Sequence, residues 1–159
     1  MRVLEGGYGR FAAGRGSMER VELYDFMRRQ RYGVVSSVAA DGTPQSALVG
    51  IATTPELCLL FDTTKSSRKY ANLVREPRCS LVIGWAGEQT LQLEGVAEEP
   101  VGDDLLRLQA AYFDAWPDGL ARMRWPEIAY FVVRPRWLRY SDYEQSPPFL
   151  WEMEFGTKA

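Results

Sequence analysis

FDTTKSSRKYANLVREPRCSL, residues 61–81, is the stretch that decides how the rest of the chain is interpreted. The apolar run 57–61 predicts a strand, and Pro77 closes a short helix that opens with Arg68 and Lys69. Four hydroxyl side chains lie in the turn between them: Thr63, Thr64, Ser66 and Ser67. Because a helix start has unpaired N–H donors and the positive end of the helix dipole, this combination predicts an anion site. A phosphate is the expected ligand.

The same residues also fit a simpler interpretation, in which a hydroxyl caps a helix and the two cations are solvated. Cations in the first turn of a helix oppose its dipole, however, and an anion would offset that cost. All four hydroxyls and both cations fall within residues 63–69. This clustering favours phosphate binding.

Length and charge restrict the class of protein. The 159 residues are enough for one domain with a sizeable core, and the formal net charge is −2. With no basic field and only strand-length apolar runs, neither a nucleic acid nor a membrane is an expected partner. Cys58 and Cys79 fall in apparent strands and are expected to be free buried thiols, which favours a cytoplasmic protein.

The chain contains no histidine. This excludes histidine general acid–base chemistry, Ser-His-Asp triads and ordinary zinc or non-haem iron sites. Two cysteines are too few for a cysteine-rich metal site, so no metal site and no catalytic side chain are predicted. If the chain is an enzyme, a redox cofactor is the economical source of its chemistry.

Residues 1–17 are rich in glycine and lack apolar periodicity, which predicts a flexible leader and no signal peptide. Two origins stay open: a natural leader, or residues added before a native start at Met18. Residues 18–159 are expected to form the single domain.

The remaining chain predicts short antiparallel strands with helices inserted between them, a small barrel and not βαβ units. A helix is expected from Ser17, as its cap, to a break at Gly33, with others at about 67–75 and 102–115. Strands are expected at 32–39, 44–51, 57–61, 79–85, about 90–96, 128–133 and 137–140. Asp41-Gly42 predicts a hairpin, Gly95 a bulge, and Pro135 a break between the last two strands.

Residues 61–81 closely resemble the flavin-phosphate segment of the pyridoxamine 5′-phosphate oxidase-like, FMN-binding split-barrel family. In that family a strand ending in an aromatic residue is followed by Thr, Ser-Arg-Lys, a short helix and Pro-Arg-x-Ser-Leu. The resemblance extends more loosely over about 18–143. It implies a mainly β fold, a six-stranded antiparallel split β-barrel of Greek-key type with peripheral helices. It also implies a homodimer with FMN, bound non-covalently, at the subunit interface.

The resemblance implies cofactor contacts from three parts of the chain. The phosphate would be held in the turn and the helix start, the flavin ring would meet the backbone of a strand entered through Gly42-Thr43-Pro44, and a polar residue early in the fifth strand would touch the flavin. The corresponding residues are Thr63, Thr64, Ser67, Arg68 and Lys69; Leu48, Val49 and Gly50; and Thr90, with Gln89 one place away.

Departures from the family affect the substrate. Where pyridoxamine phosphate oxidases carry an Arg towards the flavin and a Lys for the substrate phosphate, this chain has Ala47 and Ala52. It also lacks their histidine-containing C-terminal segment. The expectation is therefore an FMN-dependent oxidoreductase acting on a small organic substrate other than pyridoxamine phosphate.

Other interpretations keep the fold. The cofactor could be the deazaflavin F420, or a haem ligated by Tyr or Cys in the absence of histidine. The chain could also store or sense flavin without catalysis, or bind no cofactor. The loops that would select a substrate, chiefly 116–125 and 144–149, carry no recognisable motif.

Overall fold

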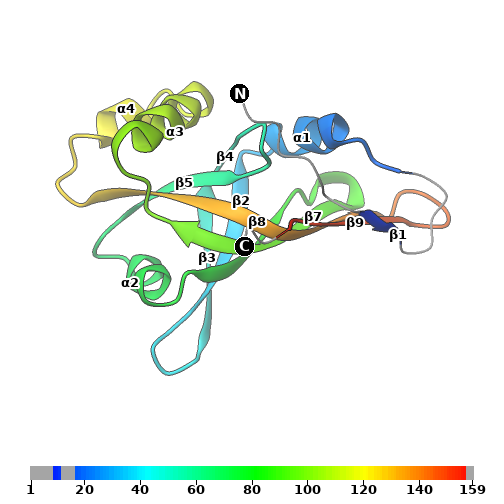
Figure 1. Cartoon of the computed structure of the whole chain (residues 1–159), viewed down its shortest axis with the longest axis horizontal. Helices are drawn as coiled ribbons and strands as arrows, with labels where there is room; N and C mark the ends of the chain where they lie inside the picture. The colour runs from blue at the N-terminus through cyan, green and yellow to red at the C-terminus, as the bar shows by residue number, and fades with distance from the viewer. Residues whose placement is uncertain (1–8, 12–16, 157–159) are drawn as a thin grey trace.

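The computed structural model describes residues 9–11 and 17–156, which form one curled antiparallel sheet with helices around it (Figure 1). The strands are β1 (Gly9–Phe11), β2 (Tyr32–Val38), β3 (Pro44–Gly50), β4 (Ala52–Thr53), β5 (Leu59–Thr64), β6 (Arg78–Ile83), β7 (Gln89–Glu98), β8 (Ile128–Asp142) and β9 (Phe149–Glu154). The helices are α1 (Arg20–Arg28), α2 (Arg68–Arg75), the 3₁₀ turn η1 (Ala86–Glu88), α3 (Gly102–Ala115) and α4 (Gly119–Arg122). The mainly β split barrel predicted from the sequence is confirmed.

Strand β8 pairs with three other strands and so connects the parts of the sheet. The order is β1-β9-β8-β7-β6-β2-β3, and β5 joins it by pairing with the first part of β8, from Ile128 to Val133. The second part of β8 pairs with β9. In Figure 1, α1, α3 and α4 lie above the sheet, whereas α2 lies below it beside the β2–β3 hairpin.

The prediction of six strands is wrong, because the described residues form a nine-stranded sheet. Three short strands were not anticipated: β1, β4 and β9. Of these, β9 follows the region 144–149 and turns Trp151 and Met153 into the core, the alternation expected of a strand with one buried face. The two residues of β4 are too few to give a periodic signal.

The predicted break at Pro135 is also wrong, since β8 runs through it. Pro135 lies opposite Gly95, where the register between β7 and β8 shifts after Glu94. This confirms the predicted bulge at Gly95. The extra residue of this bulge is Arg136 on β8, which has no partner on β7. Because the ladder is interrupted there, the neighbouring proline, which has no N–H to donate, fits without ending the strand.

Two core clusters lie on opposite faces of β5 and β8. Phe61 and Phe131 belong to the larger cluster, inside the curled sheet, where α1 also packs. Leu60 and Val132 belong to the smaller cluster beneath α3. Both faces are covered where these strands pair, and the runs 57–61 and 128–133 are accordingly apolar without alternation.

The helices largely match their predictions. The ranges predicted for α2 and α3 are confirmed to within one residue. The first helix is shorter than expected, and its cap is Glu19 in a reciprocal capping box with Glu22; the prediction that Ser17 caps it is wrong. The short helix α4 lies inside the predicted loop 116–125.

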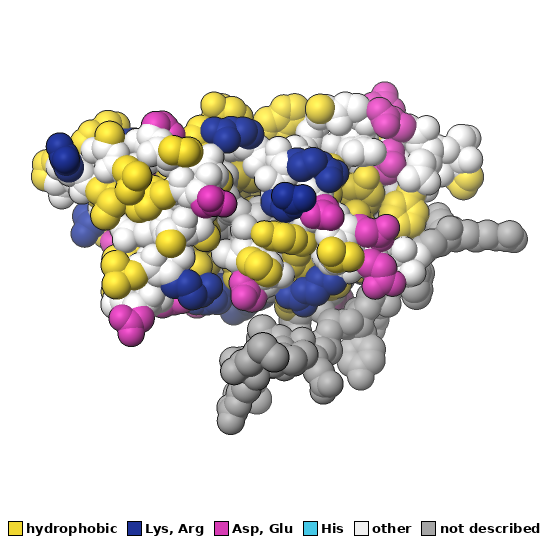
Figure 2. Space-filling view, turned by 90° about the horizontal axis from the view of Figure 1, so that it is seen from above, with side chains coloured by type: hydrophobic (Ala, Val, Ile, Leu, Met, Phe, Trp, Pro, Cys, Tyr) yellow, Lys and Arg dark blue, Asp and Glu magenta, His cyan; other side chains and the backbone are white. Residues whose placement is uncertain are grey.

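Most of the predicted leader, residues 1–8 and 12–16, lies outside the described residues. Gly9–Phe11 forms β1 and pairs with β9. On the side of the molecule that carries α1, α3 and α4, cations, carboxylates and apolar side chains are interspersed (Figure 2).

The bulge gives a stability prediction. A Cβ added at Gly95 would lie 2.4 Å from the Arg134 carbonyl oxygen, so Gly95→Ala must displace backbone and is expected to destabilise the fold by about 1–3 kcal/mol. Gly156→Ala is the control, because nothing lies within 4 Å of that position. Urea unfolding measures both, and equal midpoints would contradict this account of the bulge.

Candidate functional site

The start of α2 lies directly beyond the end of β5. Ser67 has extended backbone geometry and caps the helix, with its Oγ accepting a hydrogen bond from the Tyr70 N–H at 3.2 Å. The first turn of α2 carries no acidic residue. The helix dipole and the cations therefore act together on the space in front of the helix.

Three of the predicted phosphate residues form one hydrogen-bonded group. Thr63 Oγ1 and Ser67 Oγ lie 2.9 Å apart, and Lys69 Nζ donates to Thr63 Oγ1 at 3.2 Å. Thr63 is buried at the end of β5, whereas Ser67 and Lys69 are half-buried. This arrangement presents an ammonium group and two hydroxyls to the same place.

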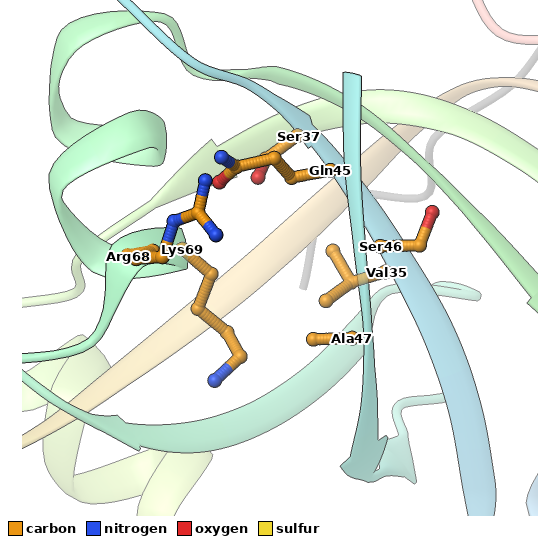
Figure 3. A pocket seen from close by; sticks show the side chains of 7 residues that line it. All are labelled: Val35, Ser37, Gln45, Ser46, Ala47, Arg68 and Lys69. Atoms are coloured by element: carbon orange, nitrogen blue, oxygen red, sulfur yellow. The ribbon is translucent and has the colours of Figure 1, made fainter. Parts of the chain in front are cut away.

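Arg68 extends from the same helix across a pocket of about 210 Å³ (Figure 3). The pocket is lined by residues of β2, β3 and α2: Val35, Ser37, Gln45, Ser46, Ala47, Arg68 and Lys69. The guanidinium of Arg68 points to the amide of Gln45, while Lys69 runs towards the open part of the pocket (Figure 3).

Asn72 connects α2 to the two strands that line this pocket. Its buried amide lies 3.1 Å from Ser37 Oγ on β2 and 2.7 Å from the amide of Gln45 on β3. The helix that carries the cations is thereby fixed to the two strands that face them. Sequence reasoning missed Ser37, Gln45 and Asn72, since no local pattern distinguishes them from other polar residues.

Thr64 stands apart from this group. Its hydroxyl accepts a hydrogen bond from Ser66 Oγ at 3.2 Å, and strand alternation turns its side chain away from that of Thr63. The structure therefore places Thr64 outside the hydroxyl–ammonium group and outside the pocket lining.

The predicted ring-binding strand, β3, is an edge strand. Among the described residues it pairs only with β2, so one edge of its backbone leaves N–H and C=O groups unpaired. The side chain of Val49 is buried and that of Leu48 is 62% exposed on the opposite face. Small Gly50, expected to admit a flat ring, lies against the indole of Trp116, whose Cζ2 would be 2.9 Å from an added Cβ.

Thr90 lies apart from the other residues predicted to contact the cofactor. It lies on β7, three strand-to-strand steps from β3 in the order β3-β2-β6-β7. At about 4.8 Å per step, the separation is roughly 14 Å across the sheet alone. Within one chain, two strands therefore lie between Thr90 and the strand proposed to meet the flavin ring.

The charged groups of the pocket are all positive. Of the pocket-lining residues, Arg68 and Lys69 are charged and none is a carboxylate. Burial raises the pKa of Cys58, and it raises the pKa of Cys79 to about 12, so both thiols stay protonated at neutral pH. Residues 17–156 contain no group of three or more Cys, Asp or Glu side chains suited to a metal ion.

Comparison with protein families gives a match over most of the chain. The profile described as pyridoxamine 5′-phosphate oxidase matches residues 21–142. The chain belongs to the pyridoxamine 5′-phosphate oxidase family. The matched residues run from α1 to the end of β8 and include every predicted site residue of the family resemblance.

Solved structures show the same fold. A heme binding protein from Mycobacterium smegmatis matches with a TM-score of 0.73 and 20% identity over 85% of this chain, which spans only 58% of that protein. A pyridoxamine 5′-phosphate oxidase-related, FMN binding protein from Nostoc punctiforme matches with a TM-score of 0.65, 14% identity, and coverage of 80% and 82% of the two chains.

An F420 reductase matches with a TM-score of 0.56 and 23% identity, over 72% of this chain and 93% of that one. A search of curated proteins found no match. Family membership thus rests on the profile, and the structural neighbours establish the fold. None of the helices in residues 17–156 is both long and apolar enough to cross a bilayer.

The capping role of Ser67 gives a second prediction. Ser67→Ala removes the acceptor for Tyr70 N–H and is expected to lower the free energy of unfolding by about 1 kcal/mol. Ser66→Ala is the matched control, because Ser66 is exposed and does not cap the helix; its effect should stay within about 0.5 kcal/mol. Equal losses in denaturant unfolding would contradict the assigned cap.

Proposed function

We propose that this protein binds FMN non-covalently through the start of α2 and acts as a flavin-dependent oxidoreductase on a small organic substrate. The observation that carries the proposal is the grouping of Thr63, Ser67 and Lys69 within hydrogen-bonding distance, with Arg68 beside it. Charge-assisted hydrogen bonds to a phosphate are among the stronger polar contacts in proteins. A phosphate would also relieve the repulsion between the two cations and the helix dipole.

The chain's own residues would bind and orient the cofactor. Arg68 and Lys69 neutralise the phosphate, Thr63 and Ser67 donate hydrogen bonds to it, and the free edge of β3 at Leu48–Gly50 faces the ring. When bound, FMN supplies the transfer of a hydride or electron pair. A pocket of about 210 Å³ is smaller than the usual site for a ligand of this size, so it would hold the phosphate end and the ring would extend beyond it.

Pyridoxamine phosphate is disfavoured as the substrate. Ala47 lines the pocket where the oxidases carry an Arg, and Ala52 is buried under α3 with Leu108 and Tyr112. A lysine at position 52 would have to enter this apolar cluster, at a large desolvation cost. These two positions support a different substrate.

F420 is the alternative cofactor. Beyond Arg68, a hollow of about 480 Å³ continues along the β2–β3 hairpin past Ala40 and Thr43, which leaves room for a longer tail. Absorption of the protein as isolated, with mass spectrometry of the released cofactor, distinguishes the two. A flavin-storing protein differs from an oxidoreductase in whether NADH or NADPH reduces the bound flavin with saturation kinetics.

A homodimer would complete the site. The outward side chains of β2 and β3, and of β6 from Ser80 to Val82, carry no charge, and several are exposed: Tyr32 48%, Leu48 62% and Val82 39%. Depletion of charge is typical of interface cores, and an uncovered edge strand such as β3 needs protection. In a dimer, Thr90 of one copy would reach the flavin bound by the other copy. Its distance from β3 within one chain would then not prevent the contact.

The phosphate site is tested by Arg68→Ala combined with Lys69→Ala. Loss of two charge-assisted hydrogen bonds, at about 1.5 kcal/mol or more each, is expected to weaken FMN binding at least about a hundredfold. Quenching of FMN fluorescence on titration measures this. Arg78→Ala with Arg107→Ala removes the same charge from exposed ion pairs and should leave binding unchanged. Tight binding of FMN by the variant that lacks Arg68 and Lys69 would contradict the assignment of the phosphate site.

The dimer is tested by Val82→Asp. A carboxylate placed in the uncharged face is expected to convert the dimer to a monomer in analytical ultracentrifugation and to weaken FMN binding with it. Val101→Asp, at a 77% exposed position outside the sheet, should stay dimeric. A wild-type monomer, or a dimer that persists in Val82→Asp, would rule out this interface.

A further inference from the structure

A rigid aromatic cluster borders the part of β3 proposed to face the flavin ring. Trp116 Nε1 donates to the Ile51 carbonyl oxygen at 2.9 Å, and its indole lies against the backbone of Gly50. A side chain at Gly50 would collide with this ring. The indole is therefore fixed in place at the end of β3, immediately after Leu48 and Val49.

Arg31 lies over this indole. Its guanidinium carbon is 3.9 Å from the ring centroid, and its Nη1 donates to the Ala115 carbonyl oxygen at 3.0 Å. The side chain is exposed, and among residues 17–156 it forms no ion pair within 4.0 Å. Asp118, the nearby carboxylate, is already held by Arg122 at 2.7 Å. Since a guanidinium has five N–H donors, Arg31 keeps several for another anion.

Flat apolar groups surround this cation. The Tyr32 and Trp116 rings are 5.5 Å apart, edge to face, and Tyr32, which is 48% exposed in one chain, lies at one end of the face assigned to the dimer. Leu48 is 62% exposed on the same face of the sheet, because Gly50 pairs with Tyr32 and Leu48 with Val34. A cation that is fixed in position beside flat apolar side chains favours binding of a ligand that is both planar and negatively charged.

We propose that Arg31, Tyr32 and Trp116 form the substrate wall of the flavin site and select a planar organic anion such as an aromatic carboxylate. This inference rests on the proposed function, since Gly50 belongs both to the cluster and to the edge of β3 assigned to the ring. It gives the anion-binding role to Arg31, because the positions that carry cations in pyridoxamine phosphate oxidases are Ala47 and Ala52 here.

The test uses the FMN-loaded protein, with benzoate as the planar anion, benzamide as its uncharged counterpart and acetate as a charge without a ring. Perturbation of the flavin absorption spectrum on titration gives the dissociation constants. Benzoate is expected to bind at least about tenfold more tightly than benzamide or acetate. Arg31→Gln should weaken benzoate binding about tenfold and leave benzamide binding unchanged, and Arg31→Lys should retain part of the preference.

Two controls separate the possible failures. Arg29→Gln removes a cation two residues away, at the end of α1, where it lines a different hollow with Tyr140 of β8, and this variant should bind benzoate like the wild type. FMN uptake by Arg31→Gln should equal that of the wild type. Loaded wild-type protein that does not discriminate benzoate from benzamide, or undiminished benzoate binding by Arg31→Gln, overturns this inference alone. Wild-type protein that takes up no FMN overturns the proposed function and this inference with it.

Discussion

The bulge between Gly95 and Pro135 is the constraint on which the rest of the structure depends. It lets one 15-residue strand, β8, serve both parts of the sheet, with β5 paired before it and β9 after it. Gly95 is required because the Arg134 carbonyl occupies the space of a side chain. The pairing of β5 with the start of β8 also fixes the strand whose end carries Thr63.

The start of α2 is locally unfavourable, and the proposed phosphate would offset this cost. Two adjacent cations without a first-turn carboxylate oppose the helix dipole, at a cost of about 0.3–1 kcal/mol for each charge. The fold compensates only in part, through the contact of Arg68 with Gln45 and that of Lys69 with Thr63. A bound phosphate would satisfy the remaining donors, which links the helix to the proposed cofactor.

Elements whose signals are local were predictable. The Asp41–Gly42 hairpin, the ranges of α2 and α3 and the bulge at Gly95 each follow from a few neighbouring residues. One of the failures had a non-local cause. Pro135 is a strand breaker in isolation, and only its position opposite the bulge makes it acceptable. Ser17 is a good cap by type, but the reciprocal pair of Glu19 and Glu22 satisfies the helix start instead.

The same division applies to the site. The residues predicted to bind phosphate fall within seven positions, so one turn and one helix cap are sufficient to bring Thr63, Ser67 and Lys69 together. Gln45 opposite Arg68, Trp116 against Gly50 and the separation of Thr90 from β3 were not readable from the chain. These relations join residues far apart in sequence, and strand register and helix packing set them. Local composition therefore predicted which residues would hold an anion, and the curled sheet determined what surrounds them.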